Sequence, residues 1–231
     1  DGLIIDLRNN GGGSLKTVVE IAGLFIKKGP VVQVKAKETN AEVLKDTDSS
    51  IAWDGPLVIM VNELSASASE ILAAAMQDYK RAIIIGSKQT YGKGTVQNVM
   101  DLNRLLRSNV VGDLGALKLT TSKFYRVNGG STQLEGVKSD IVVPDRYSYI
   151  DIGEKDQENP LKWDKIEPAD YDLWTDLSGY EAIISRSKAR MIVNSQLQLI
   201  EENAKWVSER RDASKFPMSY DGYQALIKSN E

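Results

Sequence analysis

A short apolar run that leads through a serine-rich turn into strong helix formers constrains this fold most. Residues 56–61 (PLVIMV) have turn formers on both sides, which is typical of a buried strand, and residues 71–79 (ILAAAMQDY) favour a helix. The serines of residues 65–70 (SASASE) therefore lie on a strand-to-helix turn. Free backbone N–H groups and the positive end of a helix dipole can stabilise a developing oxyanion there. Such a turn suits a nucleophile.

The same turn also fits an ordinary helix start, because Ser67 to Glu70 reads S-x-x-E, the capping box. The chain contains no histidine and no cysteine, which excludes Ser-His-Asp triads, cysteine nucleophiles and metal sites built from those residues. A nucleophilic serine would then need another base, and lysine can serve when burial favours its neutral amine. Lys93 is the candidate, since Gly92 and Gly94 allow close backbone approach; a solvated loop lysine is the alternative.

Further strands and helices follow the same pattern along the first half of the chain. Residues 3–7 and 81–86 predict buried strands, residues 31–37 alternate as a half-buried strand, and Ser14 can cap a helix that reaches Phe25. The order strand, helix, strand, strand, helix, strand predicts an α/β layered domain. Residues 11–13 (GGG) form either a tight turn or a phosphate-binding loop.

A nucleotide-binding P-loop at residues 86–95 is a poor fit. Five residues separate Gly86 from Gly92 where the template has four, and Gly94 stands where the magnesium-binding hydroxyl belongs. Residues 95–99 also alternate as a strand, whereas a P-loop leads into a helix. The net charge of −3 gives no support to nucleic-acid binding. No apolar run approaches the ~20 residues of a membrane span.

The chain divides by composition into three parts. Residues 1–150 predict the α/β core, residues 151–176 are acidic and aromatic and predict an irregular wrapping segment, and residues 177–231 predict a helical extension. Within that extension, residues 180–211 indicate one helix and residues 216–231 show little pattern. Because Asp1 leads directly into a strand-like run, we expect a fragment of a longer protein.

Three motifs in order carry a resemblance: residues 6–13 (DLRNNGGG), 65–70 (SASASE) and 92–97 (GKGTVQ). Together they resemble the tail-specific, or C-terminal processing, serine proteases, from Asp1 to about residue 145. The resemblance implies a ClpP/crotonase-like ββα-superhelix core, a Ser-Lys endopeptidase, and no metal or cofactor. It further implies protein or peptide substrates with apolar C-termini, a PDZ domain before Asp1 that this chain lacks, and a periplasmic or envelope location.

The resemblance also assigns roles by position. Ser67 matches the nucleophile, Lys93 the general base, and Gln97 the glutamine that orients the lysine. The backbone N–H groups of Gly13 and Ala68 match the oxyanion hole.

Two departures from the family pattern concern neighbouring segments. Residues 87–91 (SKQTY) are one residue longer than the usual loop, so Ser67 and Lys93 are 93 − 67 = 26 residues apart, and a bulge must absorb the extra residue. In residues 136–144, Ser139 replaces a proline of the family. A non-catalytic peptide-binding module on the same fold is therefore the alternative function, and an acyl-CoA enzyme of the crotonase type is a third.

Overall fold

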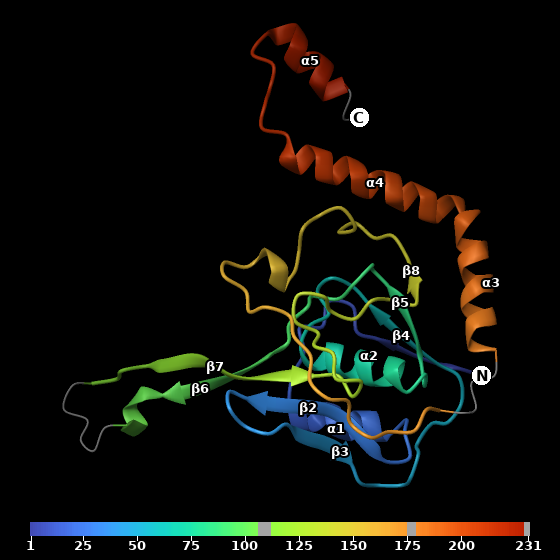
Figure 1. The fold of residues 1–231 in the computed structure, drawn as a ribbon. Helices are drawn as coiled ribbons and strands as arrows, with labels where there is room; N and C mark the ends of the chain where they lie inside the picture. Colours follow the sequence, from blue (N-terminus) through green and yellow to red (C-terminus); the bar gives the residue numbers. More distant parts are fainter. Residues whose placement is uncertain (106–111, 175–178, 229–231) are drawn as a thin grey trace.

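The computed structural model describes residues 1–105, 112–174 and 179–228. Within these residues, two four-stranded sheets form the core of a mixed α/β fold (Figure 1). The first sheet is parallel, in the order β1 (Leu3–Asp6), β4 (Leu57–Val61), β5 (Ile83–Gly86), β8 (Ile141–Val142). The second is antiparallel, in the order β3 (Glu42–Asp46), β2 (Gly29–Ala36), β7 (Ala116–Tyr125), β6 (Thr95–Asp101).

One helix, α2 (Ala68–Asp78), joins the two sheets. It contacts β5 of the parallel sheet and β2 of the antiparallel sheet, and it also packs against α1 (Leu15–Gly23). Residues 68–76 of α2 are all buried, including the polar Ser69 and Glu70. The N-terminus of this buried helix carries Ser67. The central position of α2 therefore fixes where the serine turn lies.

The predicted strands are present, but the structure corrects the burial of two of them. β1 is an edge strand and Ile4 is 64% exposed, so its predicted burial was wrong. β2 does not show the predicted alternation, because residues 30–33 are all buried and residues 34–36 are partly buried. The Gln33 amide donates to the carbonyls of Arg126 and Glu167, so a distant segment covers the second face of β2.

That covering segment is part of the predicted wrapping region. Ala169 N–H donates to the Val127 carbonyl (2.8 Å) and Trp174 N–H to the Tyr79 carbonyl (2.8 Å). The region is irregular apart from a short 3₁₀ turn, η2 (Glu154–Asp156). Outside that turn, its backbone hydrogen bonds are made to the core, which is why no strand or helix pattern marks this stretch.

The helical extension begins where the sequence predicts and then differs from the prediction. α3 (Tyr180–Ile192) and α4 (Ser195–Asp212) replace the single predicted helix, because the Asn194 side chain accepts two backbone N–H groups and starts a new helix. α5 (Tyr220–Lys228) occupies the stretch in which we found little pattern. α4 and α5 extend away from the two sheets (Figure 1). No helix in the described ranges is long and apolar enough to cross a membrane.

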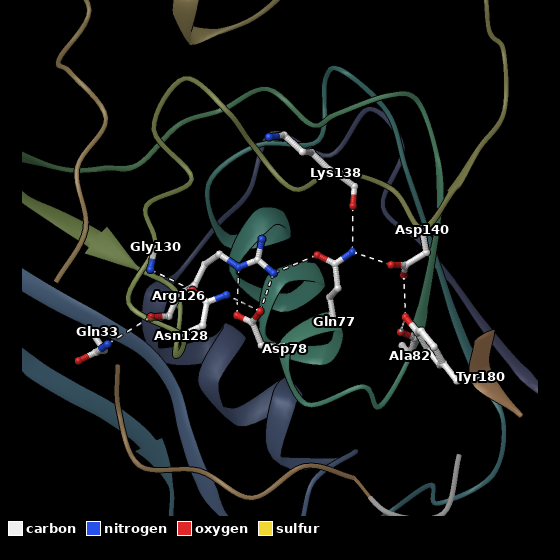
Figure 2. A network of polar contacts seen from close by, with 10 residues as sticks. All are labelled: Gln33, Gln77, Asp78, Ala82, Arg126, Asn128, Gly130, Lys138, Asp140 and Tyr180. Atoms are coloured by element: carbon white, nitrogen blue, oxygen red, sulfur yellow. Dashed lines mark hydrogen bonds and ion pairs between the residues drawn. The ribbon is translucent and has the colours of Figure 1, made fainter. Parts of the chain in front are cut away.

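A polar network anchors the C-terminal end of α2 (Figure 2). Asp78 forms an ion pair with Arg126, with 2.6 Å between Oδ1 and Nη2, and these side chains are only 6% and 16% exposed. The Gln77 amide donates to the Lys138 carbonyl (2.9 Å) and to Asp140 Oδ1 (3.0 Å). The Tyr180 hydroxyl donates to Asp140 Oδ2 (2.9 Å), so the network also holds the first residue of α3.

Candidate active site

One pocket of about 390 Å³ brings the five predicted site residues together. Gly13, Ser67, Ala68, Lys93 and Gln97 all line it. They come from three segments: the glycine-rich turn after β1, the start of α2, and β6 with the loop that leads into it. Separate parts of the chain thus converge where the resemblance implies a single site.

Ser67 has an uncommon backbone conformation, with φ 57° and ψ −114°. Such strain costs about 1–3 kcal/mol and is concentrated at functional sites. The glycine-rich turn lies directly against it: a Cβ on Gly12 would lie 2.7 Å from the Ala66 carbonyl oxygen and 2.8 Å from Ala68 N. Ala66 N–H also donates to the Asn10 carbonyl (3.0 Å). Gly12 is therefore required by close approach, which favours a tight turn at residues 11–13.

Glu70 makes one of the two hydrogen bonds of the predicted capping box and three more. Its carboxylate accepts the backbone N–H of Ser67 (2.8 Å), as a capping box requires. It also accepts the Thr90 hydroxyl (2.6 Å) and the N–H groups of Gly92 (2.7 Å) and Lys93 (3.0 Å). The same carboxylate therefore caps α2 and binds the lysine loop to the serine turn.

Glu70 is fully buried, and this burial raises the pKa of its carboxyl to about 7, although its four hydrogen bonds act in the opposite direction. Its part in connecting the two segments is not visible in the sequence, where the capping box alone explains the residue.

Lys93 and Gln97 are in direct contact. The Lys93 ammonium Nζ donates to Gln97 Oε1 at 3.1 Å. Lys93 precedes β6 and Gln97 lies on that strand, so a regular element fixes the glutamine. A strand follows the Gly-Lys pair, which agrees with our rejection of a P-loop.

The loop of residues 87–91, which is one residue longer than the usual loop of the family, is hydrogen-bonded to the segment that contains Ser139. That segment is the second departure from the family pattern. The Ser139 hydroxyl donates to the Ser87 carbonyl (2.7 Å), and Thr90 N–H donates to the Val137 carbonyl (3.1 Å). A proline at position 139 would have no hydroxyl for the first bond. With this loop, Lys93 lies on the same pocket as Ser67.

A second pocket of about 510 Å³ continues the first one. The two share Gly11, Lys93, Thr95, Gln97 and Lys118. The first pocket has apolar side chains in its lining, including those of Leu15, Ile71, Val96 and Phe124. The second is bounded by residues 157–161 of the wrapping region and by Glu154. Sequence reasoning missed this wall, because more than 60 residues separate it from Lys93 and no motif marks it.

The described ranges contain no group of three or more Asp or Glu side chains placed to hold a metal ion. The reactive groups that line the first pocket are the Ser67 hydroxyl, the Lys93 amine, the Gln97 amide and backbone N–H groups.

Comparison with known proteins gives two matching family models. Residues 1–143 match peptidase family S41, and residues 147–231 match the C-terminal domain of tail specific protease. The tail-specific protease of Haemophilus influenzae is 43% identical over 95% of this chain and 32% of its own length. The carboxy-terminal-processing protease of Bartonella bacilliformis is 36% identical over 70% of this chain and 36% of its own.

A solved structure shares the core. The photosystem II D1 C-terminal processing protease aligns with a TM-score of 0.53 and 32% identity, over 62% of this chain and 34% of the other. This chain spans about a third of the length of these relatives. From the matched models, the identity to curated proteases and the shared core, the chain belongs to peptidase family S41, with the tail-specific and C-terminal processing proteases.

Proposed function

We propose that residues 1–150 are the catalytic core of a serine endopeptidase that uses a Ser-Lys site. The observation that carries this proposal is the convergence of Ser67, at the strained start of a buried helix, with the Lys93–Gln97 pair on one pocket. Residues 151–176 wrap this core and residues 177–231 form its helical extension. Membership of a peptidase family supports the reaction class.

In the proposed reaction, the Ser67 hydroxyl attacks the scissile carbonyl and transfers its proton to the neutral Lys93 amine. Gln97 accepts one N–H of that amine, which leaves the nitrogen lone pair free to turn toward Ser67. The protonated lysine then donates to the leaving amine, and water hydrolyses the acyl-enzyme.

The N–H groups of Gly13 and Ala68 stabilise the oxyanion in this mechanism. Ala68 is the first residue of α2, so its N–H lies among the unpaired donors at the positive end of the helix dipole. Losing one oxyanion donor typically costs about 2.7–4 kcal/mol of barrier.

For substrates, we propose proteins or peptides recognised by their apolar C-terminal tails. The names of the relatives and the apolar side chains in the first pocket support this choice. A PDZ region outside this chain would bind the tail, in a periplasmic or envelope compartment. The Haemophilus influenzae relative is about three times as long as this chain, which leaves room for such a region.

The test is degradation of an unfolded model protein with an apolar C-terminus, by the complete natural protein. Ser67→Ala and Lys93→Ala should each lower kcat/KM by about 10³-fold or more. Lys88→Ala, which removes an exposed lysine of the same loop, should leave it unchanged. Lys93→Ala should also remove the rising limb of the pH–rate profile.

An active-site serine probe distinguishes the alternatives. Covalent labelling of Ser67 would support the nucleophile assignment. A wild-type protein that binds the tail peptide, is not labelled and cleaves nothing would be the non-catalytic binding module instead.

A further inference from the structure

Residues 131–134 lie against the loop that carries Lys93. The Thr132 hydroxyl donates to the Lys93 carbonyl (2.9 Å), and Leu134 N–H donates to the Gly92 carbonyl (2.8 Å). Between these two bonds, Gly94 N–H donates to Gln133 Oε1 (2.9 Å). A Cβ on Gly94 would lie 2.7 Å from Gln133 N, so the two backbones are in close contact.

Gln133 is fully buried, and its amide connects this loop to a third segment. Its Nε2 donates to the Leu161 carbonyl (3.1 Å) and to Glu154 Oε1 (3.3 Å). The amide therefore has its acceptor end on the Gly94 backbone and its donor end on the wrapping region. An apolar side chain at position 133 would leave the Gly94 N–H, the Leu161 carbonyl and the Glu154 carboxylate without this hydrogen-bond partner.

The wrapping region also holds the lysine loop directly. Glu154 N–H donates to the Tyr91 carbonyl (2.9 Å), and the Gln157 amide donates to the Tyr91 hydroxyl (2.9 Å). A Cβ on Gly153 would lie 2.9 Å from the Tyr91 carbonyl oxygen. We call residues 153–161 the strap.

We infer that Gln133 is a positioning residue for the general base, and that the strap holds Lys93 in place through Gln133 and Tyr91. This inference rests on the proposed function of Lys93. The strap lies within residues 147–231, which match the C-terminal domain of tail specific protease. That domain would then contribute to the catalytic site itself.

The physical reason is the flexibility of the lysine loop. Gly92 and Gly94 flank Lys93 and give its backbone wide conformational freedom. A displacement of about 1 Å can cost about 100-fold in rate, so the freedom must be removed by outside contacts. Glu70 binds the loop to the serine turn, and Gln133 with the strap binds it to the wrapping region.

The test uses Gln133→Leu in the complete natural protein, with Gln33→Leu as the matched control. Gln33 is also buried, and its amide also binds the wrapping region, through the Glu167 carbonyl. Its other amide hydrogen bond goes to the Arg126 carbonyl, away from the lysine loop. Both variants should lose stability. Only Gln133→Leu should lower kcat, by about 10- to 100-fold with KM within about twofold, at a temperature where both are folded.

Exchanging the donor and the acceptor tests the hydrogen bond between Gln133 and Glu154. Gln133→Glu keeps an acceptor for Gly94 N–H, but it loses both donor contacts and sets a carboxylate against Glu154. Adding Glu154→Gln supplies an amide N–H to the new carboxylate and should recover most of the lost kcat. A residue with only a packing role would not be rescued in this way.

Amide hydrogen exchange gives a readout independent of cleavage. Exchange at Gly94 should become faster in Gln133→Leu and stay at the wild-type rate in Gln33→Leu. Equal kcat values for these two variants, or unchanged Gly94 exchange, would overturn the inference while the Ser67-dependent activity stands. Absence of Ser67-dependent cleavage in the wild type would overturn the proposed function and this role for Gln133 together.

Discussion

At the scale of single residues, the conformation of the serine turn depends on two neighbours, the glycine at position 12 and the buried carboxylate of Glu70. Ser67 has a positive φ, and the turn at Gly12 is packed against it with no room for a Cβ. The buried Glu70 carboxylate binds the backbone of both the serine turn and the lysine loop. The geometry of the reactive groups is thus set by residues that take no part in the proposed chemistry.

Gly12→Ala should reduce activity strongly, because the new Cβ would overlap the Ala66 carbonyl and Ala68 N, and because the φ of +104° at Gly12 strains any L-residue. We expect kcat/KM to fall by about 100-fold. Gly11→Ala is the control, since a Cβ there meets nothing within 4 Å. Equal activity of the two variants in the peptide-cleavage assay would show that the close approach is unimportant.

Glu70 should make stability depend on pH. Its pKa is about 7 in the folded state, raised by burial from an ordinary 4.5, so the folded state binds the proton more tightly than the unfolded state. Stability from this group is therefore complete below pH 4.5 and declines as pH rises toward 7, by about 3 kcal/mol at most. Urea unfolding at pH 5 and pH 8 should show a smaller decline in Glu70→Gln than in the wild type. An identical decline would contradict the assignment.

At the scale of elements, α2 is held at both ends. Its N-terminus is fixed by Glu70 and the glycine turn, and its C-terminus by the network of Figure 2. In that network, Asp78 also accepts the Asn128 amide, and Arg126 also donates to Gln77 Oε1. Because the helix is rigid over this length, an anchor at one end helps to fix Ser67 at the other.

Asp78→Asn should lower the free energy of unfolding by about 3 kcal/mol, because it leaves the Arg126 guanidinium nearly buried without its counter-charge. Glu135→Gln, which breaks the exposed pair with Lys138, should cost less than about 1 kcal/mol. Urea unfolding monitored by circular dichroism measures both. Equal midpoints would mean that the buried pair contributes no more than a surface pair.

At the scale of the whole molecule, the helical extension is attached to the core at particular points. α3 packs on the parallel sheet through Tyr180 and Ile184, which form a buried cluster with Ile83 and Ile141. Farther along, Tyr149 contacts α4: its hydroxyl donates to Glu201 (2.6 Å) and its carbonyl accepts the Ser208 hydroxyl (2.7 Å). The first attachment is apolar and buried, whereas the second is polar and exposed.

Tyr149→Ala removes the hydroxyl that binds Glu201 and keeps the carbonyl that accepts Ser208, so it should weaken the attachment of α4 without loosening the core. We expect amide exchange in α4 to accelerate while exchange in β4 and α2 keeps the wild-type rate, because exposed polar contacts contribute only about 0–1 kcal/mol each. Tyr220→Ala, at a residue that is 76% exposed on α5, is the control and should change neither. Faster exchange in β4 would show that the extension stabilises the core.

Much of the core could be predicted because its information is local. Strand runs such as residues 57–61, the Ser14 helix cap and the three site motifs are contained in short windows, where periodicity and capping decide the structure. The two largest errors were also local in cause. Asn194 divided the predicted helix through its own side-chain hydrogen bonds, and Ser219, whose hydroxyl accepts Gly222 N–H, precedes an overlooked helix.

By itself, the sequence determined the α/β class, the place of the serine turn before a helix, and the exclusion of histidine and cysteine chemistry. Only the tertiary structure decided that Ser67, Lys93 and Gly13 share a pocket, that Glu70 joins two loops, and that Gln133 connects the lysine loop to the strap. The reason is that these contacts join segments distant in sequence, and the buried polar groups find partners only after packing brings the segments together.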